Sequence, residues 1–205
     1  MNTALETDRL ILTTLTERDA NRVLAYEIRN RAFLSDWDPL RSDAYFTLEQ
    51  QRCVLKQMVK EMEAGTRCSL GIGLKGEDRL IGMINFTNIV RGCFLSCFAG
   101  YRLDEQEINK GYMTEALTRA VRYAFDNLKL HRVEANIIPR NIRSRRVAEK
   151  AGFECEGTSR EYLKINGVWE DHMHYVRLNR KMPEPPAGTK KISIPKDIAQ
   201  SREKD

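Results

Sequence analysis

The spacing of apolar residues predicts several helices in this chain. Residues 112–128 place apolar side chains three and four positions apart, which is the pattern of an amphipathic helix. Weaker patterns of the same kind predict further helices over residues 16–33, 47–63 and 141–150. Thr16 and Thr47 are suitable N-caps for the first two, and Ala151-Gly152 is typical of a left-handed helix end after the last.

Short apolar runs bounded by turn residues predict the strands. They cover residues 7–15, 67–74, 79–88, 94–103, 133–138, 153–159 and 168–178. One strand comes first, two helices and three consecutive strands follow, and strands then alternate with helices before a final pair of strands. This order indicates an α/β fold with one mixed central sheet. Residues 34–46 are expected to form an irregular connection.

Composition favours one globular domain, over residues 1–180. The 205 residues are 41% hydrophobic and 31% charged, which excludes a disordered or fibrous chain. Residues 181–205 are rich in proline and lysine, and we expect a mostly disordered basic tail. The N-terminus lacks an apolar signal segment, and no run approaches the ~18 apolar residues of a membrane span. We therefore expect a cytoplasmic protein without membrane contact.

Charge and cysteine content exclude little else. The net charge of +5 is compatible with an anionic cofactor or a partner rich in nucleic acid, but establishes neither. Five cysteines form an odd number, which argues against a disulfide framework. Cys93 and Cys97 are interpreted as small buried residues rather than zinc ligands, so no metal is expected. Residues 71–76 match the dinucleotide fingerprint GxGxxG, but a strand follows them instead of a helix, which excludes that interpretation.

The start of the 112–128 helix is a candidate phosphate site. A strand ends at Gly100-Tyr101-Arg102-Leu103-Asp104, and a short loop with Lys110 and Gly111 leads into the helix. The first turn of a helix has unpaired N–H groups, and its dipole favours an anion. Gly111 allows close approach and Lys110 adds positive charge. Many helices begin after a glycine, so an ordinary helix start is the alternative.

Several stretches together resemble a known family, the GNAT superfamily of acetyl-CoA-dependent N-acetyltransferases. The likeness spans about residues 5–180 and is closest to the RimJ/RimL type, which acetylates the N-termini of ribosomal proteins. The stretches that carry it are residues 85–92, 110–117, 141–144, 150–157 and 161–172. The first and last of them are similar to the RimJ branch in particular. The resemblance implies the GNAT fold, a mostly antiparallel sheet with splayed strands flanked by helices.

The resemblance also implies the acetyl-CoA site. Backbone groups of Tyr101 and Leu103, on the splayed strand, would contact the pantetheine arm. The pyrophosphate would lie on the backbone of Asn109, Lys110, Gly111, Tyr112, Met113 and Thr114. Asn141 and Ser144 match the family's Asn-x-x-Ser near the sulfur. The family's pyrophosphate loop falls on residues 108–113, where only Gly111 is retained. Asn109 tolerates a left-handed conformation, whereas Ile108 supplies no polar side chain.

The implied reaction is direct attack of a neutral amine on the thioester, without a covalent enzyme intermediate. Ser144 is the candidate that protonates the departing sulfur. Glu161 is the candidate that takes the amine proton through a water, and Tyr162 is the alternative in either role. A plain cap for Ser144 and a surface carboxylate for Glu161 are the non-catalytic interpretations. We expect His172 and His174 to have packing or surface roles.

The expected substrate is the α-amine of a protein N-terminus, on a ribosomal protein or a nascent ribosome. A first alternative is a GNAT enzyme for a small amine, such as an amino acid, a polyamine or an antibiotic. A second is a CoA-binding, ribosome-associated module. The acetyl-CoA residues do not separate the first two, and only the 85–92 and 161–172 stretches favour the ribosomal protein. The tail lysines are expected to add weak, salt-dependent contact with RNA, without sequence-specific nucleic-acid binding.

Overall fold

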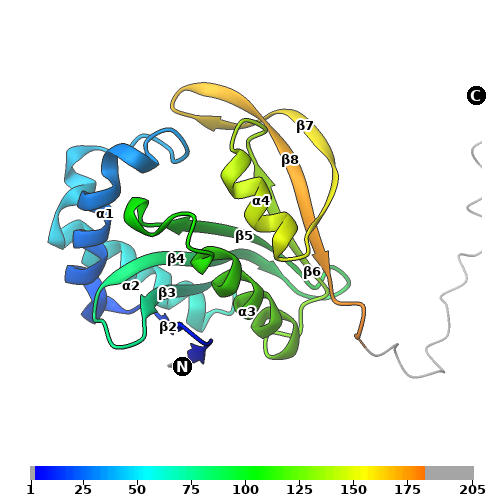
Figure 1. Cartoon of the computed structure of the whole chain (residues 1–205), viewed down its shortest axis with the longest axis horizontal. Helices are drawn as coiled ribbons and strands as arrows, with labels where there is room; N and C mark the ends of the chain where they lie inside the picture. Colours follow the sequence, from blue (N-terminus) through cyan, green and yellow to red (C-terminus); the bar gives the residue numbers. More distant parts are fainter. Residues whose placement is uncertain (1–2, 183–205) are drawn as a thin grey trace, which may run out of the picture.

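A single eight-stranded sheet organises the protein (Figure 1). The computed structural model describes residues 3–182, so the prediction of a disordered tail falls almost wholly outside the described residues. The strand order is β1-β2-β3-β4-β5-β6-β8-β7, and only the β5–β6 pair is parallel. The strands are β1 (Ala4–Glu6), β2 (Leu10–Thr14), β3 (Cys68–Leu74), β4 (Leu80–Val90), β5 (Ser96–Leu103), β6 (Arg132–Ile137), β7 (Glu154–Ile165) and β8 (Val168–Leu178).

Helices cover both faces of this sheet. The α-helices are α1 (Ala20–Leu34), α2 (Leu48–Glu63), α3 (Tyr112–Asp126) and α4 (Ile142–Lys150). Ile84 and Phe86 of β4 point into a large core with α3 and α4, while Met83 points into a smaller core with α1 and α2. Alternate residues of one strand thus face different helix pairs, as the period of a strand requires. No helix within residues 3–182 has the length and apolar character needed to cross a bilayer.

Strands β5 and β6 part halfway along their length. Their pairing runs from Ser96 with Arg132 to Phe98 with Glu134, and there it ends. Strand β5 continues to Leu103 paired with β4 alone, and β6 continues to Ile137 paired with β8 alone. The sheet is therefore splayed at its centre, which confirms the expected GNAT architecture.

Local signals set most helix boundaries where the sequence predicted them. Thr47 accepts a hydrogen bond from the backbone of Gln50 and begins α2. Thr16 and Asp19 form a capping box. It begins a short 3-10 turn that leads into α1. Gly152 has a φ of +79°, which gives α4 its left-handed end. These helix ends depend on neighbouring residues alone, which is why the sequence indicates them.

Two strand predictions are wrong. Residues 4–6 form a separate strand β1, which the sequence analysis did not include. Strand β7 does not end at residue 159 but runs to Ile165, where Asn166 and Gly167 turn the chain into β8 with φ values of +51° and +84°. Positive φ at both central residues is the signature of a type I′ hairpin turn, for which Asn-Gly is the favoured pair. That signal was present in the sequence and overlooked.

The prediction that Cys93 and Cys97 are both buried is correct for Cys97 only. Cys97 is buried in β5, whereas Cys93 is exposed because the strand begins at Ser96. Burial raises the pKa of the Cys97 thiol to about 12. Within residues 3–182, no group of three or more His, Cys, Asp or Glu side chains is placed to hold a metal ion.

A buried ion cluster ties the 35–46 connection to the sheet. Arg102 of β5 contacts Glu27 of α1 at 2.8 Å and Asp38 at 2.7 Å. The Arg102 side chain is 19% exposed and that of Glu27 is 6% exposed. Tyr45 also donates to the Glu27 carboxylate, at 3.3 Å. The Arg102 guanidinium pairs with both carboxylates, and burying either charge without a partner would cost free energy of folding.

We predict that Arg102→Met destabilises the protein by about 3 kcal/mol, because it leaves the Glu27 charge buried and unpaired. Urea unfolding measures the change. Arg122→Met is the matched control, since Arg122 is 78% exposed and its pair with Asp126 is on the surface of α3. The control is expected to change stability by less than about 0.5 kcal/mol. Equal stability of the two variants would show that the cluster does not hold the connection.

Candidate active site

Tyr101 and Ser144 meet at the point where β5 and β6 part. The Tyr101 hydroxyl donates to the backbone carbonyl of Ser144 at 2.8 Å, and Ser144 Oγ donates to that hydroxyl at 3.0 Å. Asn141 caps α4 by accepting from the backbone N–H of Ser144 at 3.1 Å. The structure thus brings three of the predicted site residues together. Sequence reasoning assigned Tyr101 through its backbone alone and missed this contact of its side chain.

The Tyr101 hydroxyl is held in its neutral form. Burial raises the pKa of Tyr101 well above its ordinary value, and the hydrogen bond from Ser144 opposes this only in part. The Tyr101 hydroxyl therefore keeps its proton at neutral pH. Since folding favours the neutral phenol, its contribution to stability is complete below the ordinary pKa of ~10 and declines as the pH rises above it.

The loop before α3 has the backbone shape expected of an anion site. Asn109 has a φ of +63° and Gly111 a φ of +81°, so both are left-handed. Helix α3 begins at Tyr112, and by helix geometry its first N–H groups have no partner within the helix. Met113 is buried in the large core, so only its backbone can face a ligand. The left-handed conformation expected of Asn109 is confirmed.

Ion pairs fix this loop from two sides. Arg9 donates to the carbonyl of Lys110 at 3.0 Å, contacts Glu115 at 2.6 Å and lies 4.5 Å over the Tyr112 ring. Thr7 also donates to Glu115, at 2.6 Å. Burial opposes ionisation of Glu115, but the hydrogen bonds from Thr7 and Arg9 outweigh it and lower its pKa. Glu115 therefore stays charged and anchors the start of α3.

Lys110 is not a free positive charge. Its Nζ contacts Glu107 at 2.8 Å, and Arg79 contacts the same carboxylate at 2.5 Å. Burial raises the pKa of Glu107, but the hydrogen bonds from Lys110 and Arg79 exceed this effect, and the net pKa is lowered. The predicted added charge at the loop is thus shared with a carboxylate, while the Lys110 side chain remains 50% exposed.

Glu161 and Tyr162 occupy an irregularity of strand β7. The β7–β8 register shifts between Ser159 and Leu163, and Glu161 has a φ of +47° there. Its backbone N–H donates to Asp171 at 2.9 Å, and its side chain is exposed. Tyr162 lies on the sheet instead, and its hydroxyl accepts from Asn136 of β6 at 3.4 Å. Tyr162, more than Glu161, is tied to the strands that part.

Strand β8 contributes two histidines beside Tyr162 that were expected to have packing or surface roles. His172 is buried and binds the carbonyl of Glu170 through Nδ1 at 2.9 Å. His174 binds Glu134 at 2.9 Å and Ser159 at 2.7 Å. Both rings contact the Tyr162 ring, with centroids 5.6 and 5.0 Å apart. Their spacing of two residues on a strand placed them on one face, which was the available signal.

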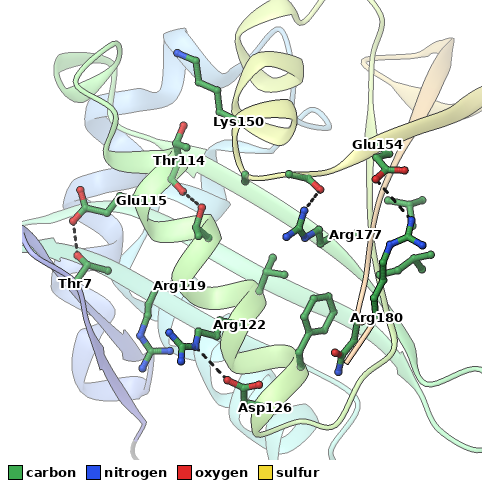
Figure 2. Close-up of a pocket in the computed structure, with 18 of the residues that line it drawn as sticks. Thr7, Thr114, Glu115, Arg119, Arg122, Asp126, Lys150, Glu154, Arg177 and Arg180 are labelled. Atoms are coloured by element: carbon green, nitrogen blue, oxygen red, sulfur yellow. Dashed lines mark hydrogen bonds and ion pairs between the residues drawn. The ribbon is translucent and has the colours of Figure 1, made fainter. Parts of the chain in front are cut away.

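A groove of about 1270 Å³ runs along the outer side of α3 (Figure 2). It begins beside Gly111 and Thr114 and continues to Asp126, with Lys150 and Arg177 on the opposite wall. Neither Tyr101 nor Ser144 lines it. The groove therefore touches the predicted cofactor loop only at the start of α3, and the paired hydroxyls lie elsewhere.

Comparison with known proteins agrees with this architecture. The family model described as acetyltransferase (GNAT) domain matches residues 9–154. The probable N-acetyltransferase YjcK of Bacillus subtilis is 44% identical over 78% of this chain and 89% of its own length. The ribosomal protein uS5-alanine N-acetyltransferase of Escherichia coli is 37% identical over 82% and 87%. The solved structure of Mycobacterium smegmatis RimJ in complex with CoA-disulfide has a TM-score of 0.81 and 24% identity, covering 89% of each chain.

We predict that Gly111→Ala costs about 1–2 kcal/mol of stability, because a side chain is strained at a φ of +81°. Gly111→Asn is the matched control and is expected to cost less, since asparagine adopts left-handed conformations more readily. Chemical unfolding of both variants measures the difference. A Gly111→Ala protein as stable as the parent would mean that the loop relaxes to a right-handed shape.

Proposed function

The chain belongs to the GNAT acetyltransferase family, and we propose that it transfers the acetyl group of acetyl-CoA to the α-amine of a ribosomal protein. The observation that carries this proposal is the pair of hydroxyls, Tyr101 and Ser144, beside the parting of β5 and β6. A splayed sheet leaves strand backbone available for a bound ligand, and a capped helix places a proton donor next to it. The acetyl donor and the amine meet there.

Acetyl-CoA fits the residues of the loop and of α4. The N–H groups at the start of α3, with Asn109 and Gly111 left-handed before them, provide an anion site for the pyrophosphate. The backbone of Tyr101 and Leu103, on the edge of β5 that lacks a strand partner after Phe98, is available to the pantetheine arm. Asn141 and Ser144 then lie next to the sulfur. The site needs no metal for this chemistry.

The reaction is a direct displacement. The amine nitrogen forms a bond to the thioester carbon, and the resulting oxyanion collapses with cleavage of the carbon–sulfur bond. CoA leaves as a thiolate and takes the proton of the Ser144 hydroxyl, and solvent returns a proton to Ser144. Burial raises the pKa of Tyr101, so Tyr101 keeps its proton and holds Ser144 in place through their two hydrogen bonds. The amine loses its proton to Glu161 through a water, or to Tyr162 if that residue is the base.

An α-amine suits this site better than a lysine side chain. An α-amino group titrates near ~7.7–8.0, so a sizeable part is neutral at physiological pH, whereas a lysine amine near ~10.4 is almost wholly charged. Only the neutral form attacks. A site whose base is an exposed carboxylate, such as Glu161, acts more readily on the amine that is already partly deprotonated.

Two features support a ribosomal protein as the substrate. The relative from Escherichia coli named above is a ribosomal protein uS5-alanine N-acetyltransferase, and it matches most of this chain. The stretches over residues 85–92 and 161–172 are also the ones that resemble the RimJ branch. A substrate of this kind places the enzyme in the cytoplasm, where ribosomes are made.

Peptides distinguish the substrate classes. With labelled acetyl-CoA, we predict acetylation of a peptide that begins with alanine or serine, and little activity on the same peptide with a blocked N-terminus and an internal lysine. Mass analysis locates the acetyl group. Comparable rates on the two peptides would contradict the α-amine assignment. Turnover of polyamines or amino acids without peptide turnover would favour the small-amine alternative, and CoA binding without any turnover would favour the binding module.

Ser144→Ala and Glu161→Gln test the proton transfers. Each is expected to lower kcat roughly 10- to 100-fold with little change in KM for acetyl-CoA, because each removes a proton transfer and not a binding contact. Thr118→Ala and Glu105→Gln, both exposed in the structure, are matched controls that retain full activity. If Glu161→Gln retained activity and Tyr162→Phe lost it, Tyr162 would be the base. Full activity in all three would remove these residues from the mechanism.

A further inference from the structure

Three residues form a row across the sheet on the side away from α3 and α4. Asn85 of β4 is paired directly with Gly100 of β5. The last β5–β6 pair is Phe98 with Glu134. Counting two residues onward along each strand gives Gly100 of β5 and Asn136 of β6, which face each other across the gap where the strands have parted. The row therefore crosses the sheet just beyond the point where β5 and β6 part.

The side chains of the row share one face. Ile84 and Phe86, on either side of Asn85, point into the large core beneath α3 and α4, and so do Ala135 and Ile137 on either side of Asn136. Successive residues of a strand point to opposite faces. Both asparagines therefore point to the α1–α2 side, which is the side where Tyr162 approaches Asn136.

Gly100 has no side chain, so the sheet surface between the two asparagines is open. It is exposed although it lies in a central strand, and a Cβ at this position would meet no atom within 4 Å. Its φ does not lie in the left-handed range, so the backbone does not require glycine here. A glycine in a strand interior often marks a place where a ligand comes close to the backbone.

Both asparagines carry an unused acceptor. Asn85 Oδ1 and Asn136 Oδ1 are buried and accept no hydrogen bond from any residue within 3–182. A buried polar atom without a partner costs free energy, and most such atoms in folded proteins are paired. The outer torsion of asparagine is soft, so a small rotation of each amide turns its oxygen toward Gly100. Two unsatisfied acceptors thus flank one open position.

We propose that Asn85 and Asn136 hold the acceptor amine over Gly100. This inference rests on the proposed acetyl transfer and assigns its acceptor site. A neutral primary amine has two N–H groups and one lone pair. Before the attack, the two amide oxygens take one N–H each, which leaves the lone pair free to attack the thioester where β5 and β6 part. Once the carbon–nitrogen bond has formed, one of these protons leaves its asparagine for the water that leads to Glu161, or for Tyr162. Asn85 also gives a role to the 85–92 stretch, which the mechanism had left without one.

The parting of the strands leaves room for this arrangement. Strands β4 and β5 are paired at Asn85 and Gly100 and lie ~4.8 Å apart there, whereas β6 has separated from β5 beyond Phe98 and Glu134. An amine in the space over Gly100 lies between the two asparagines, and each amide oxygen that turns toward it accepts an N–H···O hydrogen bond of ~2.9 Å. Any side chain at position 100 would occupy that space.

The arrangement also selects the class of amine. A neutral secondary amine has only one N–H and satisfies one of the two oxygens. We therefore expect a peptide beginning with N-methylalanine to be a poorer substrate than the same peptide beginning with alanine. Removal of either oxygen is expected to reduce this preference, because the second N–H then has no acceptor to reach.

The test uses Asn85→Leu, Asn136→Leu and Gly100→Val in the full chain, with Asn127→Ala, at the exposed C-cap that follows α3, as the matched control. Each leucine variant is expected to lower kcat/KM for an alanine peptide roughly three- to tenfold, and Gly100→Val more than tenfold. CoA is expected to raise the Tm of each variant by as much as it raises the Tm of the parent. Asn85→Leu is expected to have an unchanged or higher Tm, because it removes an unsatisfied buried oxygen, whereas Asn136→Leu also loses the hydrogen bond to Tyr162.

A purely structural asparagine would give the opposite result, a lower Tm with unchanged kcat/KM, and this outcome would overturn the proposal. So would a Gly100→Val protein with full peptide turnover, or an unchanged preference against N-methylalanine in both leucine variants. Failure of the proposed function is visible separately, as a parent protein that acetylates no N-terminal peptide. If the parent then acetylates a small primary amine, the same ratios between variants and parent still test the amine site.

Discussion

The early end of pairing between β5 and β6 is the constraint on which the functional architecture depends. Backbone N–H and C=O groups on the facing edges of residues 99–103 and 135–137 lack strand partners once the two strands part after Phe98 and Glu134. Backbone polar groups that are buried without a hydrogen-bond partner cost free energy. Strong pairing of β5 with β4 and of β6 with β8, and the cores on both faces, hold the two halves apart. The fold therefore maintains a line of backbone without strand partners, which is where we propose that acetyl-CoA binds.

Successive side chains of β5 point to opposite faces of the sheet, so the opening has two chemically different sides. Tyr101 points toward α4 and binds Ser144, whereas Arg102, the next residue, points toward α1 and binds Glu27. In the proposed reaction, the first side receives the thioester and its leaving sulfur, and the second, where Gly100 also lies, receives the incoming amine. One stretch of β5 would then separate the two substrates and bring their reacting atoms together. Because Arg102 also holds the 35–46 connection through Asp38, the amine side is fixed by a buried ion pair and not by the strand alone.

The sequence was sufficient where local interactions decide the structure. The caps at Thr47 and Gly152 and the left-handed Asn109 depend on a few neighbouring residues, and all three were predictable. The paired hydroxyls of Tyr101 and Ser144 were not, because they join residues far apart in the chain whose meeting depends on where β6 ends. The length of β7 was missed through an overlooked Asn-Gly turn. The exposure of Glu161 follows from a register shift against β8, and no pattern within β7 reveals it.

In the loop before α3, ion pairs hold the backbone in place although most of the family's loop motif is missing. Of the family's loop glycines only Gly111 is retained, yet the loop is held by ion pairs on both sides, Arg9 with Glu115 and Arg79 with Glu107. An ion pair with solvent access contributes little by itself, but these two pairs hold the same short loop and restrict the same few backbone torsions. Arg9 also binds the Lys110 carbonyl, so it fixes backbone and not only charge. Since an anion at this loop is bound by N–H groups, a rigid backbone matters more than the side chains of the motif. The pairing of Lys110 with Glu107 is therefore compatible with an anion site formed by the backbone.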